Sequence, residues 1–239
     1  MHSLVLLTMQ MKQASTQKPT QVRLGKIPVM KLPPQRPIGA GEAARIKALI
    51  QQLAQIDKPD FGLSPSMTGM AFAPIPDSGN MSMMVLADHN LQHATPLVEL
   101  VRIGPRALPF LLEALEDTTP TQLVVKHGRI IMMLEHLNEM WGNPANVREQ
   151  KALSEKPKRD FNQAFVKDPP TSHTVTICDV CFVIIGQITG RHYQAVRYQP
   201  SGIMVINSPT YDSSIVKAAR AIWASENPTQ YVLDSLLLD

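Results

Sequence analysis

The two cysteines of this chain have the spacing that most readily suggests chemistry. Cys178 and Cys181 form a C-x-x-C motif, and no other cysteine occurs in the 239 residues. Thiols at this spacing on a helix face the same way, so the pair could exchange a disulfide or supply half of a metal site. However, the apolar run 182–185 follows directly, and unpaired cysteine is among the most buried residue types. We therefore expect two buried, inert thiols, with a redox or metal-binding role as the alternative.

A structural zinc site built on this motif would need two further ligands. His173 and His192 flank the cysteines and are the candidates. The resulting order, H-x4-C-x2-C-x10-H, is not a standard zinc-ligand spacing. A thioredoxin-type motif would have an exposed first cysteine, usually with Trp, Gly or Pro nearby. We therefore predict no metal ligand, no cofactor and no catalytic residue.

Two other groups of polar residues suggest chemistry but favour plainer roles. His89 and His93 lie four residues apart beside Asp88, as metal ligands on one helical turn would, yet their surroundings favour a solvated loop. A second group interleaves cations with aromatic residues but has no wider basic field, so we expect its side chains at the edge of a helical layer. The net charge of only +3 gives no global attraction to nucleic acid, and we expect none as a partner. This second group comprises Arg191, His192, Tyr193, Arg197 and Tyr198.

The sequence of residues 95–117 predicts helices, which are the elements that would position the polar side chains described above. Apolar residues repeat at helical spacing on both sides of Gly104-Pro105, which indicates two short amphipathic helices joined by a tight corner. We expect Thr95 to cap the first helix and Pro96 to occupy its first helical position. Neither helix can bury its apolar stripe alone, so the helices must pack in layers. The stripes comprise Leu97, Leu100 and Val101, then Leu108, Leu111, Leu112 and Leu115.

The segment around the cysteines is apolar enough to be either a buried strand or a buried helix. Gly190 lies where a left-handed residue ends a helix, and Asp179 lies where an acidic residue meets the positive end of the helix dipole. These two residues favour a helix. The same spacing rules predict four further helices, over residues 41–57, 130–141, 214–225 and 229–238.

The segments between these helices are less regular. Residues 121–126 and 196–206 contain short apolar runs that fit strands as well as helices. The polar run 147–160 is expected to be an exposed connection and is the best internal boundary. Residues 61–90 have the composition of a long loop, which could cover a helical layer or roof a pocket. The predicted fold class is therefore mostly α, an irregular helical array with long loops and a few short strands.

Residues 1–40 differ in composition from the remainder of the chain. No acidic residue precedes Glu42, and basic residues are spaced among Pro, Gln and Thr. This composition predicts a basic, Pro-rich, disordered arm in front of a single domain over residues 41–239. The apolar run 4–7 is shorter than a secretory core usually is, so we expect a cytoplasmic protein, with export as the alternative if this run belongs to a signal peptide. No segment has the length of a membrane span.

Two segments resemble units of known helical-repeat proteins. LVRIGPRALPFLLEALED, residues 100–117, resembles the two-helix unit of HEAT-like repeats, an aliphatic helix, a Gly-Pro corner and a Leu-rich helix. VTICDVCFVIIGQITGR, residues 175–191, is similar to another recurrent unit of bacterial HEAT-like proteins, in which an Asp opens a helix that ends in Ile-Thr-Gly. Together they cover less than a fifth of the chain, and no period of about 30 to 47 residues recurs along it. The resemblance implies an all-helical scaffold that recruits partners and carries no catalytic residues.

These observations favour a non-catalytic helical scaffold that binds another protein through its surface. Two alternatives stay open. One is a thiol redox or metal-binding role that depends on Cys178 and Cys181. The other is an enzyme with a pocket beneath the 61–90 loop.

Overall fold

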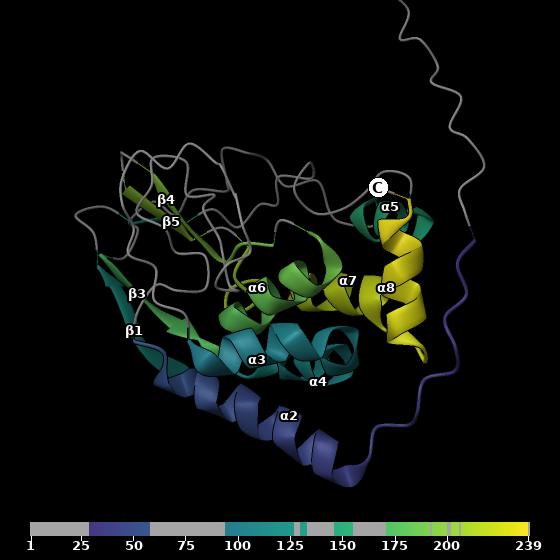
Figure 1. Ribbon diagram of the computed structural model, residues 1–239. Helices are drawn as coiled ribbons and strands as arrows, with labels where there is room; N and C mark the ends of the chain where they lie inside the picture. The colour runs from purple at the N-terminus through teal and green to yellow at the C-terminus, as the bar shows by residue number, and fades with distance from the viewer. Residues whose placement is uncertain are drawn as a thin grey trace, which may run out of the picture.

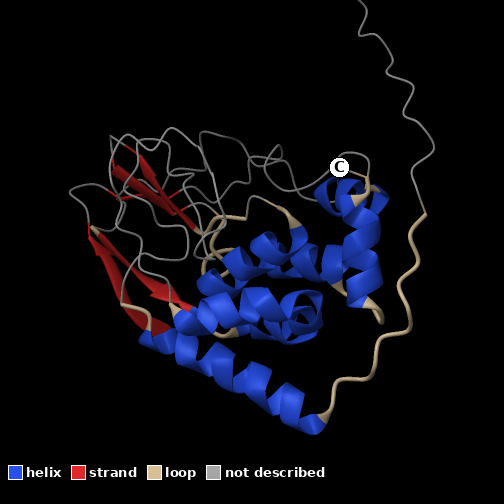
Figure 2. Ribbon diagram, in the orientation of Figure 1, coloured by secondary structure: helices blue, strands red, loops and turns tan. Residues whose placement is uncertain are grey.

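Helices make up most of the part of the chain that the structure describes, and two small sheets lie beside them (Figures 1 and 2). The strands gather on one side of the helices, at the left of Figure 2. No helix within the described ranges is both long and apolar enough to cross a membrane. The computed structural model describes residues 29–57, 94–126, 130–132, 146–154, 171–191, 193–199, 202–205 and 207–238.

The predicted helix over residues 41–57 is confirmed. Helix α2 spans Ala40–Gln52 and continues as the 3-10 turn η1, Leu53–Gln55. Its apolar residues recur at helical spacing and lie on its inner side, against the neighbouring helix and the first strand. The buried residues of this inner side are Ile46, Leu49, Ile50, Leu53 and Ile56.

The predicted pair of helices with a Gly-Pro corner is confirmed, whereas the predicted Thr95 cap is wrong. Gly104 ends the first helix with a positive φ of 69°, which glycine adopts readily, but its ψ of −143° lies outside the left-handed helical region. The first helix begins one residue early, so Ala94 occupies the cap position, Thr95 is the first helical residue and Pro96 is the second rather than the predicted first. The predicted stripe leucines are all buried, and Val101 is half-buried. The elements are α3 (Thr95–Ile103), η2 (Gly104–Ala107), α4 (Leu108–Glu113) and η3 (Ala114–Glu116).

Both segments with undecided secondary structure form strands. Strand β1 (Pro120–Lys126) alternates exposed and buried residues and pairs antiparallel with β3 (Ser172–Thr176). In the other sheet, β5 (Gly202–Val205) lies between an antiparallel β4 (Val196–Gln199) and a parallel β2 (Ile130–Met132). The predicted helix over 130–141 is therefore wrong at its first three residues, where two β-branched isoleucines join a sheet. Residues 133–141 lie outside the described residues.

The predicted exposed connection over 147–160 is wrong for its first half. Helix α5 spans Val147–Ser154, and it buries Glu149 and Ala152. The apolar pattern of this segment is weak because one of its two inner residues is charged, and hydrophobic periodicity cannot detect a buried ion pair. Residues 155–160 lie outside the described residues.

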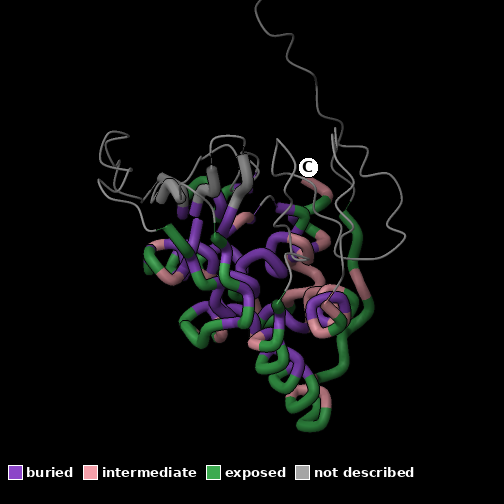
Figure 3. The backbone as a smooth tube through the Cα atoms, turned by 90° about the vertical axis from the view of Figure 1, so that its left-hand side faces the viewer, coloured by how far each residue is buried: buried purple, intermediate pink, exposed green. Residues whose placement is uncertain are grey.

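The helix predicted around the cysteines is confirmed and forms the centre of the fold. Helix α6 spans Ile177–Thr189 and is buried along nearly its whole length. Gly190 ends it in the left-handed conformation, with φ 69° and ψ 29°. The two C-terminal helices, α7 (Ser213–Trp223) and α8 (Pro228–Leu236), are confirmed as well, and the Asp212 side chain caps α7 by accepting a hydrogen bond from the Ser214 N–H. Helix α6 contacts α3 and α4 on one side and α8 on another (Figure 1), and buried residues concentrate in this interior (Figure 3).

The structure describes part of the predicted arm, from residue 29 onward. Residues 29–39 form neither a helix nor a strand. They run beside α8 before the chain enters α2 (Figure 1). Hydrogen bonds from their backbone to Gln230 of α8 and to Arg106 of η2 hold this part of the arm at the surface.

Candidate functional site

The C-x-x-C motif lies in the first two turns of α6, and both of its thiols are free and buried. The Cys178 sulfur lies 3.1 Å from the Thr176 hydroxyl and 3.3 Å from the Thr210 hydroxyl. Burial raises the pKa of the Cys178 thiol and raises the pKa of the Cys181 thiol well above its ordinary value. A reactive cysteine needs a lowered pKa, because the thiolate is the nucleophile and the metal ligand. This environment therefore favours two protonated, unreactive thiols.

Asp179, between the two cysteines, is the centre of a buried hydrogen-bond network. It accepts a hydrogen bond from the Thr176 backbone at 3.2 Å, and the Thr176 hydroxyl accepts one in return, which makes a reciprocal cap for α6. Its other oxygen accepts hydrogen bonds from the Ser208 hydroxyl at 2.5 Å and the Thr210 hydroxyl at 3.4 Å. Asp179 is fully buried. The carboxylate thus joins the start of α6 to the turn that precedes α7.

His173, the predicted candidate ligand before the motif, belongs to the same network. Its Nε2 lies 3.2 Å from the Asp179 carboxylate, and its Nδ1 lies 3.1 Å from the Tyr211 hydroxyl. Because the carboxylate can only accept, Nε2 carries the proton and Nδ1 accepts from the tyrosine in the neutral ring. Burial and the Asp179 charge raise the pKa of Tyr211, which keeps its hydroxyl a neutral donor. The series of carboxylate, imidazole and phenol therefore ends at Tyr211, which is 43% exposed and whose raised pKa disfavours the phenolate.

The remaining candidate ligands are not brought together with the thiols in the described residues. Both ring nitrogens of His173 are engaged by Asp179 and Tyr211. Across the described ranges no group of three or more His, Cys, Asp and Glu residues could hold a metal ion. His192, the other predicted candidate, lies outside the described residues, as do Asp88, His89, His93 and the loop over 61–90.

Arg191 occupies the interior, and the expectation that it lies at the edge of a helical layer is wrong. Its guanidinium donates from Nη2 to the Glu149 carboxylate at 2.9 Å and from Nε to the same carboxylate at 3.1 Å. It also donates to the Ser235 hydroxyl at 2.9 Å. Only 7% of Arg191 and none of Glu149 is exposed. This buried ion pair connects α5, the end of α6 and α8.

Tyr193 is buried as well, with its ring against the central helix. The ring stacks on Phe182 with centroids 4.6 Å apart, and its hydroxyl accepts a hydrogen bond from the Trp223 indole at 2.9 Å. The structure describes the side chains of two residues of the cation and aromatic group, Arg191 and Tyr193. Both are buried, so neither offers a surface to nucleic acid.

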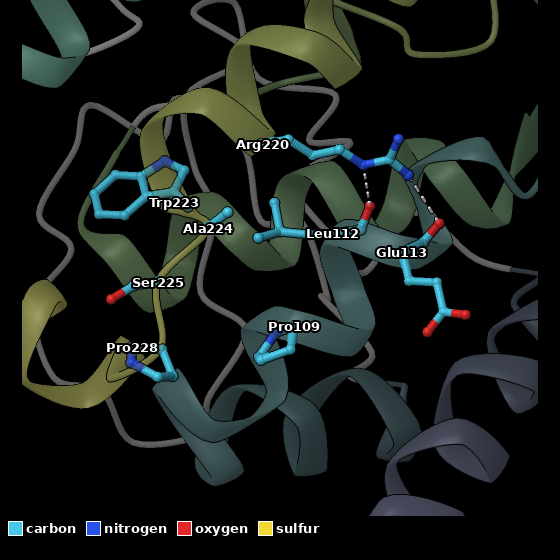
Figure 4. Close-up of a pocket in the computed structure, with 8 residues that line it drawn as sticks. All are labelled: Pro109, Leu112, Glu113, Arg220, Trp223, Ala224, Ser225 and Pro228. Atoms are coloured by element: carbon cyan, nitrogen blue, oxygen red, sulfur yellow. Dashed lines mark hydrogen bonds between the residues drawn. The ribbon is translucent and has the colours of Figure 1, made fainter.

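An open groove of about 430 Å³ lies between α4, the end of α7 and the start of α8 (Figure 4). Its lining is mostly apolar. Arg220 crosses one side and donates to the carbonyl oxygens of Leu112 and Glu113 at 3.1 and 3.4 Å. Sequence reasoning missed this groove because its walls come from three elements that meet only in the folded chain. The lining residues are Pro109, Leu112, Glu113, Arg220, Trp223, Ala224, Ser225 and Pro228.

The described residues thus define a mostly helical protein with buried polar networks and an open apolar groove. No family model matches the chain, and no curated protein or solved structure matches it either.

Proposed function

We propose that this chain is a non-catalytic helical scaffold that binds a partner protein in the groove between α4, α7 and α8. The contrast between the buried polar side chains and the exposed apolar groove supports the proposal. The polar groups best suited to chemistry, Cys178, Asp179 and His173, are buried and bonded to structural partners. The groove, in contrast, presents apolar groups to solvent. The α3–α4 pair, with its Gly-Pro corner, supports an assignment to HEAT-like helical units.

The groove fits an apolar side chain of the partner with a basic side chain next to it. Pro109, Ala224 and Pro228 provide apolar lining, and a buried apolar group is the usual anchor of a protein interface. The Arg220 guanidinium is already occupied, because it donates to two carbonyl oxygens and to the Glu116 carboxylate. The exposed Glu113 carboxylate points away from the other lining side chains in Figure 4, and no described side chain pairs with it. An incoming Lys or Arg could pair with this carboxylate at the rim.

The thiol alternative has weaker support. A redox or metal-binding role would require Cys178 and Cys181 to be accessible and to ionise readily. Both are buried, and burial raises the pKa of each. The alternative of an enzyme pocket beneath residues 61–90 lies outside the described residues.

A charge placed in the groove tests the proposal. Ala224→Lys adds a long cationic side chain to the groove wall, at an exposed position just after α7. Ala48→Lys is the matched control, because Ala48 is exposed on α2 and does not line the groove. Partners captured from the native cell by the wild-type chain should be identified, purified and titrated against all three proteins by calorimetry.

We expect Ala224→Lys to weaken the binding of one identified partner by about tenfold or more, which corresponds to about 1.4 kcal/mol. Ala48→Lys should bind like the wild type, and circular dichroism should show the same helical content in all three proteins. A partner that binds all three proteins equally would exclude the groove as its site. If no partner binds the wild-type chain specifically, the scaffold function itself is refuted.

A further inference from the structure

Residues 31–37, with the sequence KLPPQRP, have a backbone that favours extended conformations. Proline occurs at positions 33, 34 and 37 and fixes its own φ near −65°. Each proline also excludes the helical region for the residue before it, which restricts Leu32 and Arg36 too. The three residues that precede a proline, Leu32, Pro33 and Arg36, are thereby directed to the β and polyproline II regions, and the fixed φ of Pro34 and Pro37 fits a polyproline II helix. In agreement, the structure places none of them in a helix or a strand.

Side chains of the helical core hold this segment by its backbone. The Gln230 side-chain amide donates to the Met30 carbonyl oxygen at 2.8 Å and accepts from the Leu32 N–H at 2.8 Å. The Gln230 amide is itself fixed by the Asp234 carboxylate at 2.7 Å. Further along, Arg106 donates to the Arg36 carbonyl oxygen at 2.9 Å. These contacts fix the course of the segment without engaging its prolines.

The prolines of the segment are exposed to solvent, as are most of its other residues. A polyproline II helix has three residues per turn, so residues three apart share one ridge. Leu32 and Ile38 would share one ridge and are both half-buried, whereas Gln35, between them on that ridge, is exposed. The other two ridges are exposed at every residue from 30 to 37, so the prolines face solvent. One exposed ridge carries Lys31, Pro34 and Pro37, and the other carries Met30, Pro33 and Arg36.

We propose that residues 31–37 are a ligand displayed for a partner domain whose aromatic-lined groove binds polyproline II helices. Pro34 and Pro37 form a P-x-x-P pair, and such grooves accept two ridges of a polyproline II helix. Lys31 lies three residues before Pro34 and has an exposed side chain, which fits an acidic pocket beside the groove. The segment is already held in place, so binding orders little additional backbone. This surface is distinct from the groove between α4, α7 and α8, and the inference does not depend on that groove.

A calorimetric titration of the full chain tests this inference. The probe is a purified SH3 domain selected for peptides of the pattern basic-x-x-Pro-x-x-Pro. The double variant Pro34→Ala/Pro37→Ala removes the two prolines of one exposed ridge. Pro120→Ala is the matched control, because Pro120 is an exposed proline at the start of β1.

The wild-type chain and Pro120→Ala should bind the SH3 domain equally, and the double variant should bind about tenfold or more weakly. Gln230→Ala should retain binding with a several-fold loss, because it frees one end of the segment and leaves the motif intact. Absence of binding by the wild-type chain, or equal binding by the double variant, would overturn the inference. Equal binding by Gln230→Ala would overturn the role of the hydrogen bonds to Gln230.

Discussion

Gly186 lies in the last turn of α6, where the chain that follows the helix returns very close to it. A Cβ atom at position 186 would lie 2.6 Å from the Arg191 carbonyl oxygen and 2.7 Å from the Tyr193 Cβ. The Gly186 carbonyl oxygen also accepts a hydrogen bond from the Arg191 N–H at 2.8 Å. These neighbours are a backbone oxygen and a Cβ, which cannot rotate away as the end of a flexible side chain can. Gly186→Ala must therefore move the backbone.

Two opposing effects decide the sign of the change in stability. Alanine is favoured over glycine in a helix interior by about 1 kcal/mol. Forcing extra atoms into a well-packed core costs about 1–3 kcal/mol. Both contacts at position 186 are shorter than 3.0 Å, so we place the cost in the upper part of this range. We expect Gly186→Ala to lower the free energy of unfolding by about 1–2 kcal/mol, against the helix propensity.

Gly41→Ala provides a control with the opposite sign. A Cβ at position 41 meets no atom within 4 Å, and the residue lies in the first turn of α2. There the substitution should raise the free energy of unfolding by about 0.5 kcal/mol. Urea unfolding of both variants and the wild type, followed by far-ultraviolet circular dichroism, measures the two changes. A Gly186→Ala protein as stable as the wild type would refute the close approach between α6 and residues 191–193.

Two further predictions concern the buried side chains at the start of α6. Asp179→Asn should lower the free energy of unfolding by about 1–2 kcal/mol, because the amide cannot accept every hydrogen bond that the carboxylate accepts. Urea unfolding measures this change, and an unchanged unfolding midpoint would contradict the prediction. The two thiols should react with a disulfide reagent far more slowly in the native protein than in urea, because both are buried. Their raised pKa values keep them protonated in the folded chain at pH values where the unfolded chain ionises. The free energy of unfolding should therefore fall as the pH rises above the ordinary thiol value of 9.0, and it should fall less in Cys181→Ala. Equal reactivity in both states, or an unchanged pH dependence in the variant, would contradict this account.

The helices other than α5 were predictable because each has apolar residues at helical spacing and at least one local end signal. Gly104 and Gly190 both have positive φ at helix ends, and Asp212 caps α7. These signals depend on neighbouring residues in the sequence. Strand pairing depends on distant residues instead, so the sequence around Ile130 does not indicate its parallel pairing with Ile203. As a result, the helical spacing of residues 130–141 gave a wrong prediction at residues 130–132.

The polar contacts were predictable only where both partners lie close together in the sequence. Thr176 and Asp179 are three residues apart and form the reciprocal cap that their spacing favours. Glu149 and Arg191 are 42 residues apart, and nothing in the sequence around either residue indicates an ion pair. Charged residues such as these are normally predicted to be solvated, because charged side chains are rarely buried without a partner. The pairing that makes burial tolerable forms only in the folded chain.

The hydrogen-bond network of Asp179 and the ion pair of Arg191 with Glu149 explain why polar groups lie at the two ends of α6. The helix is buried on nearly every side, so apolar packing alone gives several similar ways to rotate or shift it among its neighbours. Asp179 fixes the start of the helix to the turn at Ser208, and Arg191 fixes the residue after its end to Glu149 and Ser235. Buried polar contacts of this kind are satisfied in one arrangement only, because any shift leaves a charge without its partner. We therefore attribute the buried polar residues of this chain to the specification of its fold, and the apolar groove and the exposed proline segment are the surfaces that we propose for binding.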